Sequence, residues 1–224
     1  MISKITSLPR QDRLSAEKIK LENLFAAYPD EMQLFVQTKT GAVISKLGGD
    51  VIISGETYAE EVKQFLPFIR PQSVFSSADN MTALFGADFE SVNVVLRENC
   101  LVAGSNMFSY DFSSREAYDL LKTDGFYLPD YEFFATDYCR RKNKGLIKVF
   151  GKRDTCIAIT LENDTCRMLS GIVSRQKGQG GSLLLSAING NRPVLAVCRD
   201  GLLPFYTKFG FTPLYKAGYW RKPT

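Results

Sequence analysis

Residues 173–184, Val-Ser-Arg-Gln-Lys-Gly-Gln-Gly-Gly-Ser-Leu-Leu, combine two cations with three closely spaced glycines. The apolar run at 169–173 predicts a strand, and the apolar pattern from Leu183 predicts a helix, so the glycines fall in a strand–turn–helix arrangement. Backbone N–H groups in such a turn point toward one spot at the positive end of the helix dipole. Because glycines let a large anion approach the main chain, the pattern indicates a site for a phosphate-bearing ligand.

Two well-known phosphate-binding loops do not match this segment. A P-loop requires Gly-x-x-x-x-Gly-Lys followed by Ser or Thr, but here Lys177 precedes Gly178. The dinucleotide fingerprint Gly-x-Gly-x-x-Gly begins correctly at Gly178 and Gly180, but Leu183 stands where the third glycine should be. The ligand is therefore neither a P-loop nucleotide nor a Rossmann dinucleotide.

A second segment, 205–211, reads Phe-Tyr-Thr-Lys-Phe-Gly-Phe and follows a predicted buried strand at 194–198. Arg175-x-x-Gly-x-Gly and this segment, in their order and spacing, resemble two motifs of the GNAT-type N-acetyltransferases. These are the acyl-CoA pyrophosphate loop and the Phe-Tyr-x-Lys-x-Gly-Phe segment. The resemblance covers about residues 155–221. Residues 137–145 and the acidic first half look like a bacterial two-lobed subgroup whose N-terminal half is a degenerate GNAT-like unit.

The resemblance implies acetyl-CoA, or coenzyme A with another acyl group, as the cofactor. Main-chain N–H groups of Ile172 and Val173 match the positions that bind the thioester oxygen in this family. Arg175 and Lys177 match phosphate partners, and the glutamines are expected to act through their backbone. The implied cofactor-binding residues are Ile172, Val173, Arg175, Gln176, Lys177, Gly178, Gln179, Gly180, Gly181 and Ser182.

The resemblance also implies Tyr206 as the catalytic residue. A phenol with a reference pKa of ~10 is protonated at neutral pH and can donate a proton to the departing thiolate. The alternative is that the Tyr206 ring, beside Phe205 and Phe209, only fills the core. Tyr215 and Tyr219 on the last predicted strand are further candidates.

The 224-residue chain contains no histidine, which excludes Ser-His-Asp and Cys-His catalysis. Five scattered cysteines, without a Cys-x-x-Cys pair, predict neither a disulfide framework nor a metal site. No general base is identified, because Glu162, Asp164 and Asp200 are interpreted as turn or loop residues. Direct attack of an amine on the thioester, without a covalent enzyme intermediate, is compatible with this composition.

Charge is divided unevenly along the chain. Residues 1–135 hold 12 basic and 19 acidic side chains, whereas residues 136–224 hold 16 basic and 5 acidic ones. A basic field around the turn would attract the polyanion coenzyme A. The alternatives are a solvated basic surface and nucleic-acid binding, but no RNP-like or helix-turn-helix signature is present, so no nucleic acid is expected. No apolar run approaches about 18 residues and no apolar leader is visible, which predicts a cytoplasmic protein without a membrane span.

The elements that must position these residues follow from hydrophobic periodicity. We expect a mixed α+β chain of two lobes, 1–125 and 126–224, the second binding acetyl-CoA, and the resemblance implies a GNAT-like acyl-CoA N-acyltransferase fold. Its sheet should be mixed, mostly antiparallel and flanked by helices. The predicted helices are 15–28, 57–69 with Thr57 as cap, 113–125 with Ser113 and Glu116 as a capping box, 137–144 with Asp137 as cap, 181–188 and 202–210. The predicted strands are 32–37, 42–47, 51–54, 74–75, 92–96, 146–150, 156–161, 166–173, 194–198 and 214–221.

The function implied is transfer of an acetyl or other acyl group from coenzyme A to a primary amine of a small molecule or peptide, in a ternary complex. A non-catalytic acyl-CoA-binding regulatory module is the alternative. Two departures from the family pattern favour it: the approach to Arg175 is a few residues short, without the usual proline and aromatic residue, and Arg199-Asp200 replaces a frequent asparagine. The sequence fixes neither the amine nor the oligomeric state.

Overall fold

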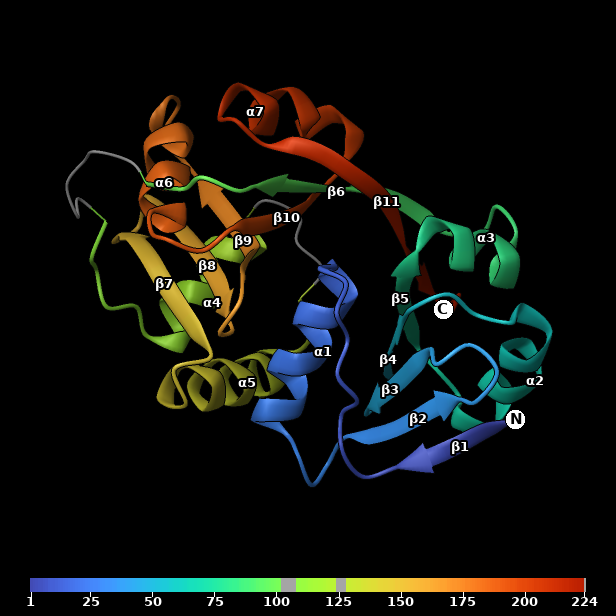
Figure 1. Cartoon of the computed structure of the whole chain (residues 1–224). Coiled ribbons are helices and arrows are strands. Elements are labelled where there is room, and N and C mark those ends of the chain that lie inside the picture. The colour runs from blue at the N-terminus through green and yellow to red at the C-terminus, as the bar shows by residue number, and fades with distance from the viewer. Residues whose placement is uncertain (102–107, 124–127, 224) are drawn as a thin grey trace. The chain divides into compact units, whose positions relative to one another are not determined.

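The computed structural model describes residues 1–101, 108–123 and 128–223 (Figure 1). Its contacts divide the chain into two compact units. The first comprises Met1–Val95, Val197–Pro204 and Pro213–Thr224, and the second comprises Leu96–Ala196 and Phe205–Thr212. This division differs from a boundary at 125/126, because the helix preceding that boundary packs within the second unit and the last strand pairs within the first.

The first unit is a sheet with helices on it. Its strands are β1 (Ile2–Ile5), β2 (Gln33–Gln37), β3 (Val43–Leu47), β4 (Asp50–Ser54), β5 (Ser73–Ser77), β6 (Glu90–Arg97) and β11 (Thr212–Arg221). Its helices are α1 (Ala16–Ala27), α2 (Ala59–Ile69) and α3 (Ala78–Phe85). The strands lie in the order β1-β2-β3-β4-β5-β11-β6. The β4–β5 pair is parallel because α2 forms the crossover between these strands.

Apolar residues at helical spacing place α2 against this sheet, as predicted. Val62, Leu66 and Ile69 are buried with strand residues in one core cluster. The predicted cap at Thr57 is wrong: the N-cap is Tyr58, without a side-chain cap bond. The Thr57 hydroxyl instead donates to Asn80 Oδ1 at 2.9 Å, so a tertiary partner competes with the local cap.

The second unit is built on the strand order β10-β9-β8-β7. The strands are β7 (Ile147–Lys152), β8 (Cys156–Glu162), β9 (Arg167–Ser174) and β10 (Val194–Cys198), and the helices are α4 (Ser114–Lys122), α5 (Tyr131–Asn143), α6 (Gln179–Ile188) and α7 (Leu203–Lys208). β7, β8 and β9 are antiparallel, and α6 crosses over to the parallel strand β10. Every residue of β8 is buried, because α6 covers one face of the sheet and α4 packs on the other (Figure 1).

Helix starts in the second unit confirm one predicted cap and correct another. Ser113 and Glu116 form the capping box of α4. The basic helix α5, however, begins six residues before Asp137, which is an interior residue paired with Arg141 at 2.8 Å. Pro129, which lacks an N–H and would break a helix interior, stands just outside the helix, before the N-cap Asp130.

The two halves of the chain repeat one order of elements. β2-β3-β4-α2-β5-α3-β6 and β7-β8-β9-α6-β10-α7-β11 each place three antiparallel strands before a crossover helix and a parallel strand. This repeat agrees with two related halves, although no sequence repeat accompanies it. Among the described residues, no helix is both long and apolar enough to span a bilayer.

Candidate functional site

The glycine-rich turn connects β9 to α6 as a tight, self-bonded loop. Ser174 Oγ donates to the carbonyl of Gln176 at 2.9 Å, and the Gln179 amide donates to the same carbonyl at 3.3 Å. Gly178 is the N-cap of α6 with φ +89°, a left-handed conformation that side-chain-bearing residues rarely adopt. The predicted strand–turn–helix arrangement is therefore present, with α6 beginning two residues earlier than expected.

The amides of Gly180 and Gly181 lie in the first helical turn, where an α-helix provides no intrahelical acceptor. No side chain of the described residues caps this end of α6. A Cβ at position 180 would meet nothing closer than the Phe205 ring at 3.9 Å, so the surface there is open. A Cβ at position 181 would lie 2.3 Å from Phe209, so the absence of a side chain at this glycine is needed for helix packing.

The cations of the turn are exposed but not equivalent. Arg175 extends the β8–β9 ladder through its amide, which donates to the Thr155 carbonyl at 2.8 Å. Its guanidinium faces the carbonyls of Asp154 and Asp119 at 3.4 and 3.5 Å. Lys177 is exposed at the turn itself.

Gln176 and Gln179 stand on either side of Gly178, and Gln176, Gly178 and Ser182 are exposed. The Gln179 side-chain nitrogen donates to the Gln176 side-chain oxygen. Its own oxygen is buried without a donor in the described chain. An unmet buried hydrogen-bonding group at the turn is compatible with a ligand that completes it.

The edge of β9 next to the turn is open. β9 pairs with β10 only from Arg167 to Leu169, whereas on its other side it pairs with β8 as far as Ser174. No described strand pairs with residues 170–174 on the β10 side. Because backbone groups alternate in direction along a strand, one of Ile172 and Val173 directs its amide to this open edge. This separation of strands is the geometry that the thioester-binding prediction requires.

Tyr206 lies in α7 and is 4% exposed. Its ring contacts Phe205 and Phe211 edge-on, with centroids 5.3 and 5.4 Å away. This packing agrees with the interpretation of Tyr206 as a core residue. The catalytic interpretation differs from it only in the role of the hydroxyl group.

Tyr215 and Tyr219 belong to the first unit. The Tyr215 hydroxyl donates to Glu17 at 2.5 Å, and burial raises its pKa, so it remains protonated. The Tyr219 hydroxyl accepts a hydrogen bond from Lys20 at 2.7 Å. Both hydroxyls therefore have structural partners on α1.

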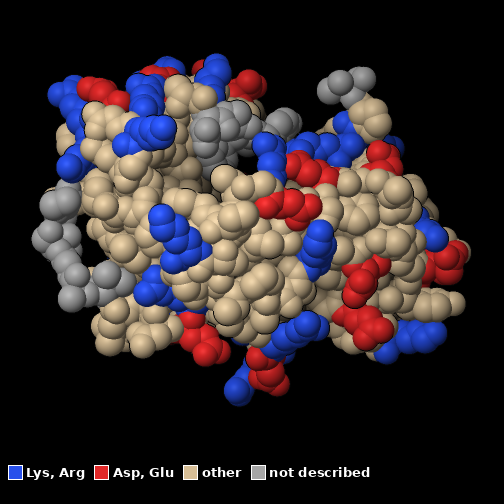
Figure 2. All heavy atoms as spheres, turned by 90° about the horizontal axis from the view of Figure 1, so that it is seen from above, with Lys and Arg blue, Asp and Glu red and all other residues tan. Residues whose placement is uncertain are grey.

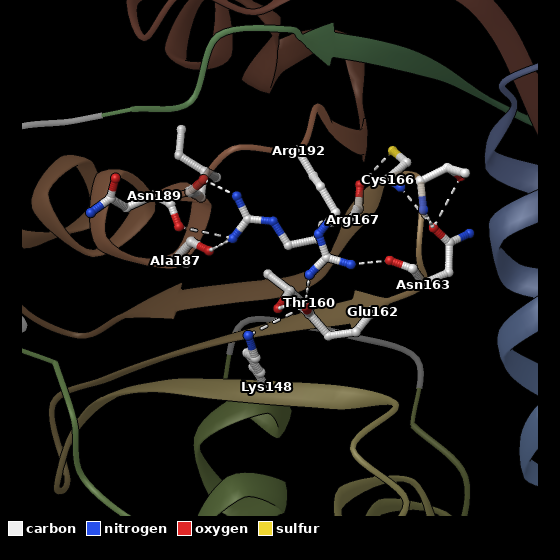
Figure 3. Close-up of polar contacts among 11 residues, drawn as sticks. Lys148, Thr160, Glu162, Asn163, Cys166, Arg167, Ala187, Asn189 and Arg192 are labelled. Carbon is white, nitrogen blue, oxygen red and sulfur yellow. Dashed lines mark hydrogen bonds and ion pairs between the residues drawn. The ribbon is translucent and has the colours of Figure 1, made fainter.

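Several charged residues of the basic half form an internal network (Figure 3). Glu162, interpreted as a turn residue, is only 7% exposed and pairs with Arg192 at 2.7 Å and Lys148 at 3.6 Å. Arg167 is 4% exposed and donates to three carbonyls at the end of α6. These groups hold the fold, and Glu162 is not available as a general base.

Sequence reasoning missed a cavity of about 220 Å³ that is lined by residues of α4, α5, β7, β8 and β9 and by Leu128. We call it the bulge cavity, because Ser170 is the extra residue of a β-bulge between β8 and β9. Its lining residues are Leu121, Leu128, Phe134, Asp137, Tyr138, Arg141, Ile147, Ile159, Leu161, Ser170 and Gly171. The available signal was the spacing of Phe134, Asp137, Tyr138 and Arg141, which places them on one face of a helix.

Three solved structures share this fold at low sequence identity. A tandem GNAT protein from the clavulanic acid biosynthesis pathway is 9% identical, with 96% of this chain and 91% of that chain covered and a TM-score of 0.54. A GCN5-related N-acetyltransferase from Sphaerobacter thermophilus is 13% identical, with 94% of each chain covered and a TM-score of 0.53. A putative acetyltransferase from Pyrococcus horikoshii is 12% identical, with 92% of this chain and 78% of that chain covered and a TM-score of 0.54.

No protein-family model and no curated protein matches the sequence. The structural likeness confirms the predicted mixed α+β class and the acyl-CoA N-acyltransferase fold, including its two-lobed form. The chain thus has the fold of the GCN5-related N-acetyltransferases.

Proposed function

We propose that this protein is an N-acetyltransferase that moves an acetyl group from acetyl-CoA to a primary amine in a ternary complex. The observation that carries the proposal is the turn at 174–182, where uncapped amides of α6 adjoin the open edge of β9. Amides at a helix N-terminus bind phosphate, and an open strand edge offers an N–H group for a thioester oxygen.

The backbone amides and the lysine of the turn are groups of the kind that bind the diphosphate of coenzyme A. The backbone of Gly178, Gly180 and Gly181 would hold the diphosphate, with Lys177 as an exposed cation beside it. An amide of Ile172 or Val173 would polarise the carbonyl. Bound acetyl-CoA supplies an activated acyl group, so the protein needs to orient the reactants and to stabilise the oxygen as it gains charge.

The chemical step balances without a further reactant. The amine nitrogen, after losing its ammonium proton to water, bonds to the carbonyl carbon. The carbon–sulfur bond breaks, and the thiolate takes a proton, for which Tyr206 is the proposed donor. The nitrogen gives up a second proton that restores the donor, leaving an amide and free coenzyme A.

Surface charge supports the proposal only locally. Figure 2 shows Lys and Arg side chains on the face drawn, with acidic groups between them. Arg167 and Arg192 are engaged in the internal network, whereas Arg175 and Lys177 are exposed within the turn itself. A local positive site suits one diphosphate better than an extended polyanion.

A non-catalytic acyl-CoA-binding module is the second candidate, favoured by residues 199–200. Arg199 pairs with Glu90 at 2.9 Å. Asp200 accepts from Asn93 at 2.7 Å, and this hydrogen bond lowers the pKa of its carboxyl. Both side chains are thus engaged within the protein, where many acetyltransferases of this fold would use an asparagine.

Calorimetric titration with coenzyme A tests the proposal. Gly180→Glu should weaken binding at least about tenfold, because its carboxylate repels the diphosphate. Gly180→Ala is the matched control: its Cβ fits, so affinity should change less than about twofold. No binding by the unmodified protein would refute the proposal, and binding without thiol release over a panel of amines would favour the module.

A further inference from the structure

The bulge cavity adjoins the position proposed for the thioester. Ser170 and Gly171 line it and also belong to the open edge of β9, directly before Ile172. Every lining residue lies in the second unit. An amine held in this cavity would therefore be beside the carbonyl bound at that edge.

The lining is mostly apolar, with one charge of each sign. The apolar side chains come from α4, α5, β7 and β8 and from the segment before α5: Leu121, Leu128, Phe134, Ile147, Ile159 and Leu161. The charges are Asp137 and Arg141, one helical turn apart and joined at 2.8 Å. Their side chains are 40% and 13% exposed, so the arginine is the more deeply placed.

This charge arrangement selects against singly charged ligands. A lone ammonium is attracted by Asp137 but repelled by Arg141. A lone carboxylate is attracted by Arg141 but repelled by Asp137. A ligand with one charge of each sign, close together, contacts both partners favourably. In an α-amino acid a single carbon separates ammonium and carboxylate, which matches charges that are one hydrogen bond apart.

We infer that the acyl acceptor is a small α-amino acid with an apolar side chain. Its carboxylate binds Arg141, its amino group lies between Asp137 and the β9 edge, and its side chain contacts the apolar walls. The α-nitrogen then attacks the thioester as described above, giving an N-acyl amino acid and coenzyme A. This inference rests on the proposed function and names the substrate class of that site.

Thiol release from acetyl-CoA tests the inference with two matched acceptors, L-leucine and isoamylamine, its analogue without the carboxylate. The value of kcat/KM for L-leucine should exceed that for isoamylamine at least about tenfold. Arg141→Gln should raise the KM for L-leucine about tenfold, because the carboxylate loses its partner, and should lower the KM for isoamylamine, because its ammonium no longer meets a cation. Arg140→Gln removes the same charge from the same helix outside the cavity lining and should leave L-leucine turnover unchanged.

The possible failures can be told apart. If coenzyme A binds and isoamylamine reacts as fast as L-leucine, the inference is overturned and the proposed function stands. A rate that rises with acyl chain length and ignores the amino acid would assign the cavity to the acyl group and likewise overturn it. If coenzyme A does not bind, both the proposed function and this inference are refuted. Thermal unfolding of each variant separates a lost contact from a lost fold.

Discussion

At the scale of single residues, the two interpretations of Tyr206 predict different kinetics. The ring is held by Phe205 and Phe211, and Tyr206→Phe keeps these ring contacts while removing the hydroxyl. If the hydroxyl protonates the thiolate, kcat should fall by roughly 10²-fold, the lower range for general acid catalysis. Affinity for coenzyme A, measured by calorimetry, should remain within about twofold. An unchanged kcat would leave Tyr206 as a core residue.

Glu116 contributes to the stability of the protein in a way that depends on pH in the acid range. Hydrogen bonds, first from the Tyr110 hydroxyl and then from Ser113, lower the pKa of Glu116 to about 2. Because the folded-state pKa lies below the unfolded value of ~4.3, the ionised group stabilises the fold above about pH 4.5. That contribution is lost as the pH falls from there toward about 2.

The corresponding test compares urea unfolding of the protein and of Glu116→Gln across this range. Glutamine can still form the capping box, so the variant isolates the charge. The protein should be the more stable near pH 5, and the difference should disappear near pH 2. Glu132→Gln changes an exposed carboxyl in the first turn of α5 and is the control. A difference that is independent of pH would contradict the assignment.

At the scale of elements, α6 is fixed at the end opposite the turn by a buried arginine (Figure 3). Arg167 donates to the carbonyls of Ala187 at 3.3 Å and Asn189 at 3.1 Å, and to that of Ile188. These are C-terminal carbonyls, for which the helix has no amide partner, and the cation also faces the negative end of the helix dipole. Arg167 therefore contributes to placing the turn at the other end of α6.

Arg167→Met should lower the free energy of unfolding by about 2–4 kcal/mol, because buried carbonyls lose charged donors. The free energy of unfolding of Arg167→Lys should lie between those of the unmodified protein and Arg167→Met, because lysine keeps the charge but lacks the planar fork of donors. Lys148→Met removes an ion pair with Glu162 in which the lysine is 59% exposed, so it should change the free energy of unfolding by less than about 1 kcal/mol. Urea unfolding measures the free energy of unfolding of all three variants. Equal losses for Arg167→Met and Lys148→Met would argue against a special role of Arg167 at the C-terminal end of α6.

Elements with strong local patterns were predictable from the sequence. The strands of the second unit were predictable because runs such as 156–161 are apolar except for Thr160, as is typical of a strand that is buried throughout. β1 and α3 were not predicted, because segments of only four and eight residues are too short to show a clear periodicity.

The candidate site was predictable only in part, for a similar reason. The turn is encoded locally by its glycines, so its position followed from the spacing. The need for a glycine at position 181 could not be predicted, because it depends on contact with Phe209, 28 positions further along the chain. The bulge cavity depends on α5 packing near β7 and on a bulge at Ser170, neither of which has a local sequence signal.

At the scale of the whole molecule, the repeated order of elements offers two equivalent positions for coenzyme A. In the first half, the equivalent of the 174–182 turn is the segment 55–58 between β4 and α2. Here the chain uses its own side chains: Gln37 Oε1 accepts from the Tyr58 amide at 2.8 Å, and Asn80 Oδ1 accepts from the Thr57 amide at 3.2 Å. The amides of Thr57 and Tyr58, just before the first turn of α2, are thus already paired.

Charge reinforces this difference between the halves. The first turn of α2 carries Glu60 and Glu61, which oppose an anion at the helix N-terminus, whereas the first turn of α6 carries no acidic residue. We therefore expect about one coenzyme A per chain, measured as the calorimetric stoichiometry. Gly180→Glu should suppress the whole of the binding signal rather than half of it. A stoichiometry near two, or a residual half in that variant, would show that the first half binds the cofactor despite its paired amides and carboxylates.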